Sequence, residues 1–251
     1  MKSELIVDIE DMSRLAVEDN EAYALNRRKG LGASDSSIIL GINKWSKLED
    51  LIEQKNRDYI GEDELAVGEK PQVRMGRDLE PFILDKASEF FGQEVKKPTA
   101  QYRVKDYPFL TINYDGAVFE PQAFTTEYTP PVQMAVEAKC VSSYARKYWD
   151  WDKSCKDFDD FVMRKNYQVM SNNLTEIIDE QAKYIGIPNY YYTQCQQQMI
   201  GTGLPYCALI ALDVKEWNVH VFKVFEDTRV QEAIACKGAE VASQCQFIET
   251  L

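Results

Sequence analysis

The sequence predicts an α/β (α+β) fold with a mixed central β-sheet flanked by helices, and three observations support this. The 251 residues, 45% of them hydrophobic, are enough for one sizeable core. Segments with apolar residues at helical spacing alternate with segments at strand spacing. The predicted order is helix, strands, helix, strands, helix, which is typical of layered folds with a mixed sheet. We therefore expect a single domain over residues 1–251, with an N-terminal helical part at 1–92 and a core at about 93–251.

The N-terminal part is expected to be mainly helical. The turn Gly30–Asp35 precedes the helix at 36–40, and Ser34 or Asp35 can cap it. Pro81 predicts that the last helix of this part either starts near Glu80 or kinks there. A loop is expected at 61–68. The segments with helical spacing are 12–25, 36–40, 48–55 and 74–91.

The remaining chain is rich in strand patterns. Loops are expected at 120–131 and, as a polar and irregular stretch, at 141–187. Helices are expected at 189–200 and 228–247. Strands are predicted at 101–105, 109–113, 116–119, 132–139, 206–213 and 219–225.

Composition excludes several function classes. The net charge of −12 argues against a nonspecific polyanion binder, so any nucleic-acid function must use local basic groups or a bound metal. A single histidine, His220, argues against a serine-histidine-aspartate triad or a histidine-rich metal site. No phosphate-binding Walker loop occurs. Without an export signal or a long apolar stretch, we expect a cytoplasmic protein with reduced cysteines and no membrane association.

One constellation can carry chemistry. Asp115 lies between two predicted strands, and Glu137 and Lys139 share one face of a later strand because side chains alternate. If the strands pair, two carboxylates converge beside one ammonium group. Paired carboxylates repel unless they share a cation, and oxygen ligands suit Mg²⁺ or Mn²⁺. This arrangement favours phosphodiester hydrolysis; the alternative is an ordinary Asp-Gly turn and a solvated strand face.

Several motifs carry a family resemblance. Asp115 followed by Glu137-Ala138-Lys139 resembles the PD-(D/E)xK core of restriction-endonuclease-like nucleases. Three further segments resemble the YqaJ-like viral recombinase and lambda-exonuclease branch. They are Gly30-Leu31-Gly32-Ala33-Ser34-Asp35, Gly76-Arg77-Asp78-Leu79-Glu80-Pro81 and Tyr191-Tyr192-Thr193-Gln194-Cys195-Gln196.

The resemblance implies roles around the metal. Asp115 and Glu137 would bind it together with the backbone carbonyl of Ala138. Lys139 would be the catalytic lysine, and Glu80 would approach the metal directly or through water. Gln194 would position the lysine or the attacking water. Tyr191, Gln194 and Gln198 share one helix face, and the alternative is a glutamine-rich solvent face.

The resemblance also implies residues that bind DNA. Ser34 and an upstream arginine would bind the 5′-terminal phosphate; Arg27 has the expected spacing, and Arg28 is the alternative. Asn113 stands where some members carry a phosphate-binding serine, and Tyr191 would also contact DNA. The tryptophans 45, 149 and 151 are expected to be packing or interface residues, with base stacking as the alternative.

The implied function is a DNA exonuclease dependent on Mg²⁺, with Mn²⁺ as an alternative. It would hydrolyse one strand of linear double-stranded DNA from 5′ to 3′ and leave 3′ single-stranded tails for phage-type recombination. The resemblance further implies a homotrimer and a single-strand annealing protein as partner. Two alternatives stay open: a related nuclease of other polarity or endonucleolytic action, and a catalytically silent acidic protein that binds DNA ends or mimics DNA.

Overall fold

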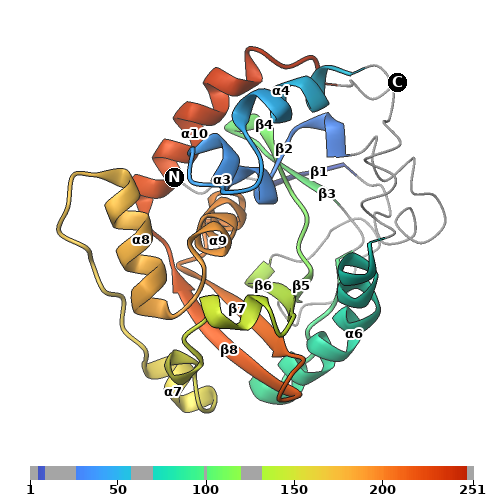
Figure 1. The fold of residues 1–251 in the computed structure, drawn as a ribbon, viewed down its shortest axis with the longest axis vertical. Helices are drawn as coiled ribbons and strands as arrows, with labels where there is room; N and C mark the ends of the chain where they lie inside the picture. Colours follow the sequence, from blue (N-terminus) through green and yellow to red (C-terminus); the bar gives the residue numbers. More distant parts are fainter. Residues whose placement is uncertain (1–4, 9–26, 58–69, 99–100, 120–131, 248–251) are drawn as a thin grey trace.

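The structure, a computed structural model, describes residues 5–8, 27–57, 70–98, 101–119 and 132–247 (Figure 1). The helix predicted at 12–25 and the loops predicted at 61–68 and 120–131 lie outside the described residues.

The described strands form two four-stranded sheets. One sheet has the order β1-β3-β4-β2 and the other β5-β6-β7-β8. In the second sheet β6 runs parallel to β7, whereas β5 and β8 are antiparallel to their neighbours, so this is the predicted mixed sheet. The strands are β1 (Leu5–Asp8), β2 (Leu31–Gly32), β3 (Gln101–Val104), β4 (Tyr107–Ile112), β5 (Gly116–Phe119), β6 (Val132–Val141), β7 (Tyr206–Asp213) and β8 (Asn218–Phe225).

Helices surround and separate these sheets. Figure 1 shows α9 near the middle of the molecule, and α9 contacts strands of both sheets. The helices are α3 (Ser36–Ile39), α4 (Leu48–Asn56), α6 (Pro71–Phe91), α7 (Phe158–Met163), α8 (Leu174–Ile185), α9 (Asn189–Thr202) and α10 (Thr228–Ala242). Short 3-10 helices are η1 (Arg27–Lys29), η2 (Ala33–Asp35), η3 (Ala145–Tyr148) and η4 (Trp151–Lys153).

The β5–β8 sheet is buried on both faces, which fixes the direction of each side chain. On β6 and β7, Val136 and Ile210 belong to the hydrophobic cluster that includes α6. Ala135 and Leu209, one position away, belong to the cluster that includes α8 and α9. Because side chains alternate, Glu137 shares the face of Ala135 and is directed toward α9.

Two helix predictions need correction. Helix α6 begins at Pro71 and continues through Pro81, so the alternative of a start near Glu80 is wrong, whereas the kink there stays a prediction. Pro71 stands in the first helical turn, where proline is well tolerated. Pro81 lies inside the helix, where burial of Leu84 and Phe91 offsets the hydrogen bond that Pro81 cannot donate. Helix α10 ends at Ala242, five residues before the predicted end.

The stretch at 141–187, predicted to be irregular, contains α7 and α8. Helix α8 has a clear amphipathic pattern, with Ile178 and Ala182 buried. The Asn173 side chain accepts hydrogen bonds from two backbone N–H groups at its start, and Gly186, in the left-handed conformation, ends it. These signals are present in the sequence and are sufficient to predict the helix.

Gly116 is required where β5 passes under α6. A Cβ atom at this position would lie 2.8 Å from both Leu84 Cδ2 and Val95 Cγ1. We therefore expect Gly116→Ala to lower the free energy of unfolding by about 1–3 kcal/mol, measured by chemical denaturation. The control is Gly76→Ala on α6, where nothing lies within 4 Å; it should raise stability by about 0.5–1 kcal/mol. Equal stability of the two variants would contradict this packing.

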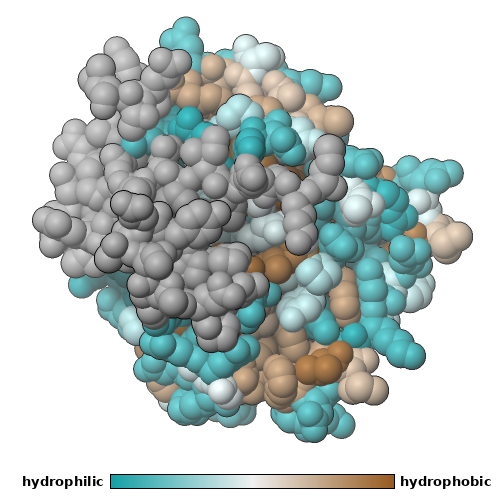
Figure 2. Space-filling view, turned by 180° about the vertical axis from the view of Figure 1, so that it is seen from behind, coloured by the Kyte–Doolittle hydropathy of each residue, from teal (hydrophilic) through white to brown (hydrophobic). Residues whose placement is uncertain are grey.

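The remaining features concern the cysteines, the helices and the surface. All six cysteines are free thiols. In the described part of the chain, no helix is long and apolar enough to cross a membrane. Figure 2 shows the face behind Figure 1, where hydrophilic residues cover much of the described surface and hydrophobic residues gather in its lower part.

Candidate active site

The structure brings Asp115, Glu137 and Lys139 together. The Lys139 ammonium donates to Glu137 Oε1, and its Nζ lies 3.8 Å from Asp115 Oδ2. The side chain of Glu137 is 1% exposed, whereas those of Lys139 and Asp115 are 19% and 28% exposed. The cluster therefore has one buried carboxylate and two groups that solvent, or a substrate, can reach.

The end of β5 explains why Asp115 reaches this strand. Pairing of β5 with β6 begins at Gly116 opposite Val136, so β6 has no β5 neighbour beyond that point. The N–H of Ala138 donates instead to Asp115 Oδ2 at 2.9 Å. In an extended strand the N–H and C=O of one residue point to the same side. The carbonyl of Ala138 therefore faces the side on which Asp115 lies.

Helix α9 supplies the other partners of Glu137. The amides of Gln194 and Gln198 donate to its two carboxylate oxygens. Gln198 is held in turn: its Oε1 accepts from Cys207 Sγ at 3.4 Å, and its backbone carbonyl accepts from the Tyr114 hydroxyl at 3.2 Å. These bonds leave the Gln198 amide N–H groups directed at Glu137.

The charges of the cluster are strongly coupled. Burial, reinforced by the neighbouring charge of Asp115, raises the pKa of Glu137 to about 8. Burial alone would lower the pKa of Lys139. The carboxylates of Glu137 and Asp115 outweigh it, so the pKa of Lys139 rises and the group stays a cation at neutral pH. A second cation near the carboxylates would relieve the remaining repulsion.

Glu80 lies within electrostatic reach of this cluster. Burial, together with the charge of Asp115, raises the pKa of Glu80. Its carboxylate pairs with Lys97 at 2.5 Å, and its side chain is 20% exposed. Glu80 is therefore an electrostatic neighbour of Asp115, with Lys97 as a partner that the sequence did not indicate. Its approach to a metal, directly or through water, stays a prediction.

Tyr191 lies over the lysine. Its ring centre is 5.3 Å from Lys139 Nζ, a cation–π contact. Trp149 packs against Tyr191 and stacks on Trp151 at 5.3 Å, and it is buried. These two tryptophans are packing residues as expected, whereas Trp45 is 65% exposed.

The N-terminal segment forms a second cluster. Arg27 Nη2 donates to Ser34 Oγ at 2.9 Å, and both residues are exposed. Behind them the buried ammonium of Lys55 contacts Asp35 at 3.0 Å and the carbonyls of Arg27 and Gly30 at 2.7 Å. These bonds hold the chain turn that presents Arg27 and Ser34. No motif in the sequence indicated this role for Lys55.

The other candidates from this region are placed differently. Arg28 is 1% exposed and donates to the carbonyl of Arg57, so its charge is directed into the protein and not toward Ser34. Asn113 is half-buried, and its Oδ1 has no hydrogen-bond partner among the described residues. The geometry at Ser34 thus favours Arg27 over Arg28.

Oxygen donors at the cluster suit a hard divalent cation. Among the described residues, no group of three or more His, Cys, Asp or Glu side chains is arranged to hold a metal ion. Mg²⁺ needs fewer, because it usually binds through one or two carboxylates and keeps several waters. Asp115 and Glu137, with the carbonyl of Ala138 on the same side, meet that requirement. The two carboxylates favour a positive charge between them, and the ammonium of Lys139 already lies beside both.

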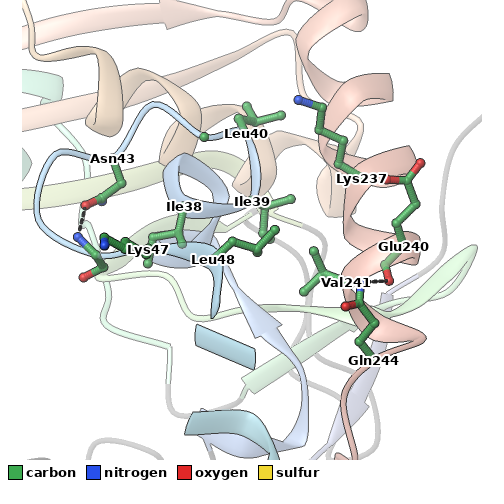
Figure 3. A pocket seen from close by; sticks show the side chains of 12 residues that line it. Ile38, Ile39, Leu40, Asn43, Lys47, Leu48, Lys237, Glu240, Val241 and Gln244 are labelled. Atoms are coloured by element: carbon green, nitrogen blue, oxygen red, sulfur yellow. Dashed lines mark hydrogen bonds between the residues drawn. The ribbon is translucent and has the colours of Figure 1, made fainter. Parts of the chain in front are cut away.

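A separate pocket of about 510 Å³ lies between α3, the loop after it, α4 and α10 (Figure 3). Ile38, Ile39 and Leu48 line it, with Lys237 and Glu240 on α10. None of its lining residues belongs to the carboxylate–lysine cluster.

Gln198 contacts the cluster directly, because its amide donates to Glu137, and the sequence did not assign it this role. It shares the α9 face with Gln194, for which the sequence allowed a solvent-exposed alternative. That alternative is wrong: on this face Gln198 is fully buried, and Gln194 is half-buried and donates to Glu137. The neighbouring Gln196 and Gln197 are also fully buried. Gln197 donates to the carbonyls of Leu31 and Thr111, so α9 also fixes the N-terminal segment.

The fold and the cluster together define a member of a known family. Residues 22–205 match the YqaJ-like viral recombinase domain, and the chain belongs to this family. The uncharacterized protein YqaJ of Bacillus subtilis (strain 168) is 27% identical over 149 residues. That alignment covers 59% of this chain but 40% of the relative, so the chain spans less than half of the relative's length.

Solved structures show the same fold. The crystal structure of LHK-Exo in complex with dAMP is similar with a TM-score of 0.52 and 15% identity, covering 89% of this chain and 93% of that one. The alkaline exonuclease LHK-Exo from Laribacter hongkongensis gives a TM-score of 0.51 at 16% identity, covering 90% and 93%. The predicted α/β (α+β) fold with a mixed sheet flanked by helices is thereby confirmed.

Proposed function

We propose that this chain is a metal-dependent DNA exonuclease that hydrolyses one strand of linear double-stranded DNA. The observation that carries the proposal is the convergence of Asp115, Glu137 and Lys139 at the open edge of β6. Family membership and the fold shared with an alkaline exonuclease support it. The whole set is intact, and a protein that only bound DNA would not need it.

Asp115, Glu137 and the Ala138 carbonyl would hold the metal, with Glu80 as a further ligand directly or through water. Mg²⁺ is the expected ion, with Mn²⁺ as an alternative. Bound there, such an ion lowers the pKa of a water molecule and neutralises charge on a phosphoryl group.

The side chains around the metal site stabilise charge and hold the ligands in position. Lys139, kept positive by its carboxylate neighbours, stabilises negative charge that develops on the phosphoryl oxygens. Gln194 and Gln198 hold the Glu137 carboxylate in one orientation. The ring of Tyr191 packs against the Lys139 ammonium and restricts the orientations that this side chain can adopt. Little rearrangement is then needed when the substrate arrives.

Arg27 and Ser34 would bind the 5′-terminal phosphate of DNA, with Asn113 as a further contact. We expect Arg27→Ala to reduce the preference for 5′-phosphorylated over 5′-hydroxyl ends by about 10- to 100-fold, because a charge-assisted hydrogen bond is lost. The measurement is the ratio of initial rates on the two ends. Lys237→Ala, which removes an exposed charge on α10, is the control and should leave the ratio unchanged. An unchanged ratio in Arg27→Ala would remove Arg27 from the end-binding site.

The finer properties follow from the family likeness. We propose 5′ to 3′ polarity, 3′ single-stranded tails for phage-type recombination, a homotrimer, and a single-strand annealing protein as partner in the cytoplasm of a bacterial or phage-infected cell. A ring of subunits around DNA would permit many cleavage steps for each binding event.

The test uses linear duplexes labelled at the 5′ or the 3′ end and a covalently closed circle, each with Mg²⁺ and with EDTA. The proposal expects the 5′ label to be released early as mononucleotide, the 3′ label to stay on long fragments, and the circle to survive. Early loss of the 3′ label would reverse the polarity, and cleavage of the circle would make the protein an endonuclease. Binding without any cleavage would establish the catalytically silent alternative.

A further inference from the structure

A row of aromatic rings begins beside the lysine of the candidate active site and leads away from it. Tyr191, over Lys139, contacts the ring of Tyr190 at 4.4 Å between centres. Trp45, from the loop between α3 and α4, packs edge-on against Tyr190 at 4.9 Å and 81°. The rings therefore form a continuous path from the lysine to the surface.

The segment after β6 extends this path. The 3-10 helix η3 follows β6 and carries Tyr148, whose ring centre is 6.5 Å from that of Tyr144. Tyr148 lies within electrostatic reach of Tyr190, whose pKa is raised first by burial and then by the phenols of Tyr191 and Tyr148. The Lys147 ammonium is 5.1 Å from the ring centre of Tyr148 and 4.3 Å from that of Tyr144. The same strand that carries Lys139 therefore leads directly to this basic and aromatic group.

The outer rings of the path are exposed although their backbone is held. Trp45, Tyr144 and Tyr148 are 65%, 74% and 46% exposed. The loop that carries Trp45 is fixed by Asn43, whose Oδ1 accepts from the N–H groups of residues 45 and 46 at 2.9 Å. Large apolar rings gathered on a surface mark an interaction site.

We propose that this aromatic path, formed by Trp45, Tyr190, Tyr148, Lys147 and Tyr144, binds an unpaired stretch of a DNA strand. Bases stack on the exposed rings, and the Lys147 ammonium contacts the phosphate backbone. Flat rings interrupted by a cation match a nucleic-acid strand, whose flat bases alternate with anionic phosphates. Stacking also tolerates every base, so the path itself would select no particular sequence.

The location of the path suits this role. It ends at Lys139, so a strand lying along it would be continuous with a phosphodiester at the candidate active site. The inference rests on the proposed function for its purpose, but strand binding itself requires no cleavage and can be measured separately.

The test is fluorescence anisotropy of a labelled oligothymidylate in EDTA, with the wild-type protein and three variants, Trp45→Ala, Tyr144→Ala and Tyr148→Ala. Each variant should weaken binding by about 5- to 100-fold. Trp45→Phe, which keeps a stacking ring, should retain most of the affinity. Trp217→Ala and Tyr184→Ala are matched controls, because their rings are 56% and 48% exposed elsewhere on the surface.

Wild-type affinity in the three path variants would overturn the inference, as would the absence of oligothymidylate binding by the wild type. A changed oligomeric state in light scattering, with unchanged affinity, would instead assign the rings to a contact between copies of the chain. Ring-dependent binding by a protein that cleaves no DNA would refute the proposed function and leave the aromatic path standing. Cleavage of DNA by a protein whose strand binding does not depend on these rings would refute the aromatic path and leave the proposed function standing.

Discussion

Glu137→Gln is expected to lower the rate of DNA hydrolysis by about 10³-fold or more. Glu137 is the buried member of the carboxylate pair, and it accepts hydrogen bonds from Lys139, Gln194 and Gln198. Glutamine has nearly the same shape, but it removes the negative charge that would hold a divalent cation. The amide nitrogen of the new glutamine would also direct N–H groups at a group that itself donates, such as the amide of Gln194 or Gln198, so the present orientation of these amides would be lost.

The measurement is single-turnover release of nucleotides from a linear duplex, with saturating Mg²⁺. Glu180→Gln on α8 is the matched control, since Glu180 is exposed and pairs only at the surface with Lys183. That control should keep the wild-type rate. If a folded Glu137→Gln protein hydrolysed DNA at the wild-type rate, the metal-binding role of Glu137 would be refuted.

Lys139→Met is expected to lower the rate constant of the chemical step by about 10²–10³-fold. The Lys139 ammonium donates a hydrogen bond to Glu137 and lies 3.8 Å from Asp115. Methionine fills a similar volume but cannot place a positive charge beside these two carboxylates. The affinity for the duplex should change much less, because a duplex is held by many phosphate contacts and this substitution removes one cation. Arginine should not rescue, since its longer, planar head group differs from a compact ammonium.

Rates at saturating duplex and duplex affinity in EDTA separate these effects. Lys215→Met is the control, because the side chain of Lys215 is 58% exposed. Equal losses of affinity and rate in Lys139→Met would indicate a DNA-binding lysine, and no loss in either would leave this lysine without the proposed role.

The core of the site was predictable from sequence because its signals are local. Strand alternation places Glu137 and Lys139 on one face, and the apolar residues before them indicate a buried strand. The position of Asp115 beside Gly116 marks the break between two strands, where a side chain can reach the open edge of the next. Both relations follow from short segments.

The rest depends on distant partners. Strand β2 has two residues, Leu31 and Gly32, and pairs with β4 far along the chain, so no local pattern predicted the second sheet. The choice between Arg27 and Arg28 depended on which way the η1 turn faces. A buried polar helix has no hydrophobic periodicity, so α9 looked compatible with a solvent-exposed face.

Helix α9 illustrates why this limit is physical. Buried glutamines are tolerated only when each amide finds partners. Here the amide N–H groups of the buried glutamines donate to Glu137, to the carbonyls of Leu31 and Thr111, and to the carbonyl of Phe225. They come from segments far apart in sequence, so only the folded chain shows that the polar face is an interior one.

The proposed chemistry depends on a divalent cation binding at Asp115 and Glu137. Isothermal titration calorimetry of Mn²⁺, in the absence of DNA, measures this binding without requiring activity. Wild-type protein should bind the ion, and Asp115→Asn should bind at least about tenfold more weakly, because one charged ligand has become neutral. Equal Mn²⁺ affinity in the two proteins, or no binding to the wild type at millimolar ion, would contradict the proposed metal site.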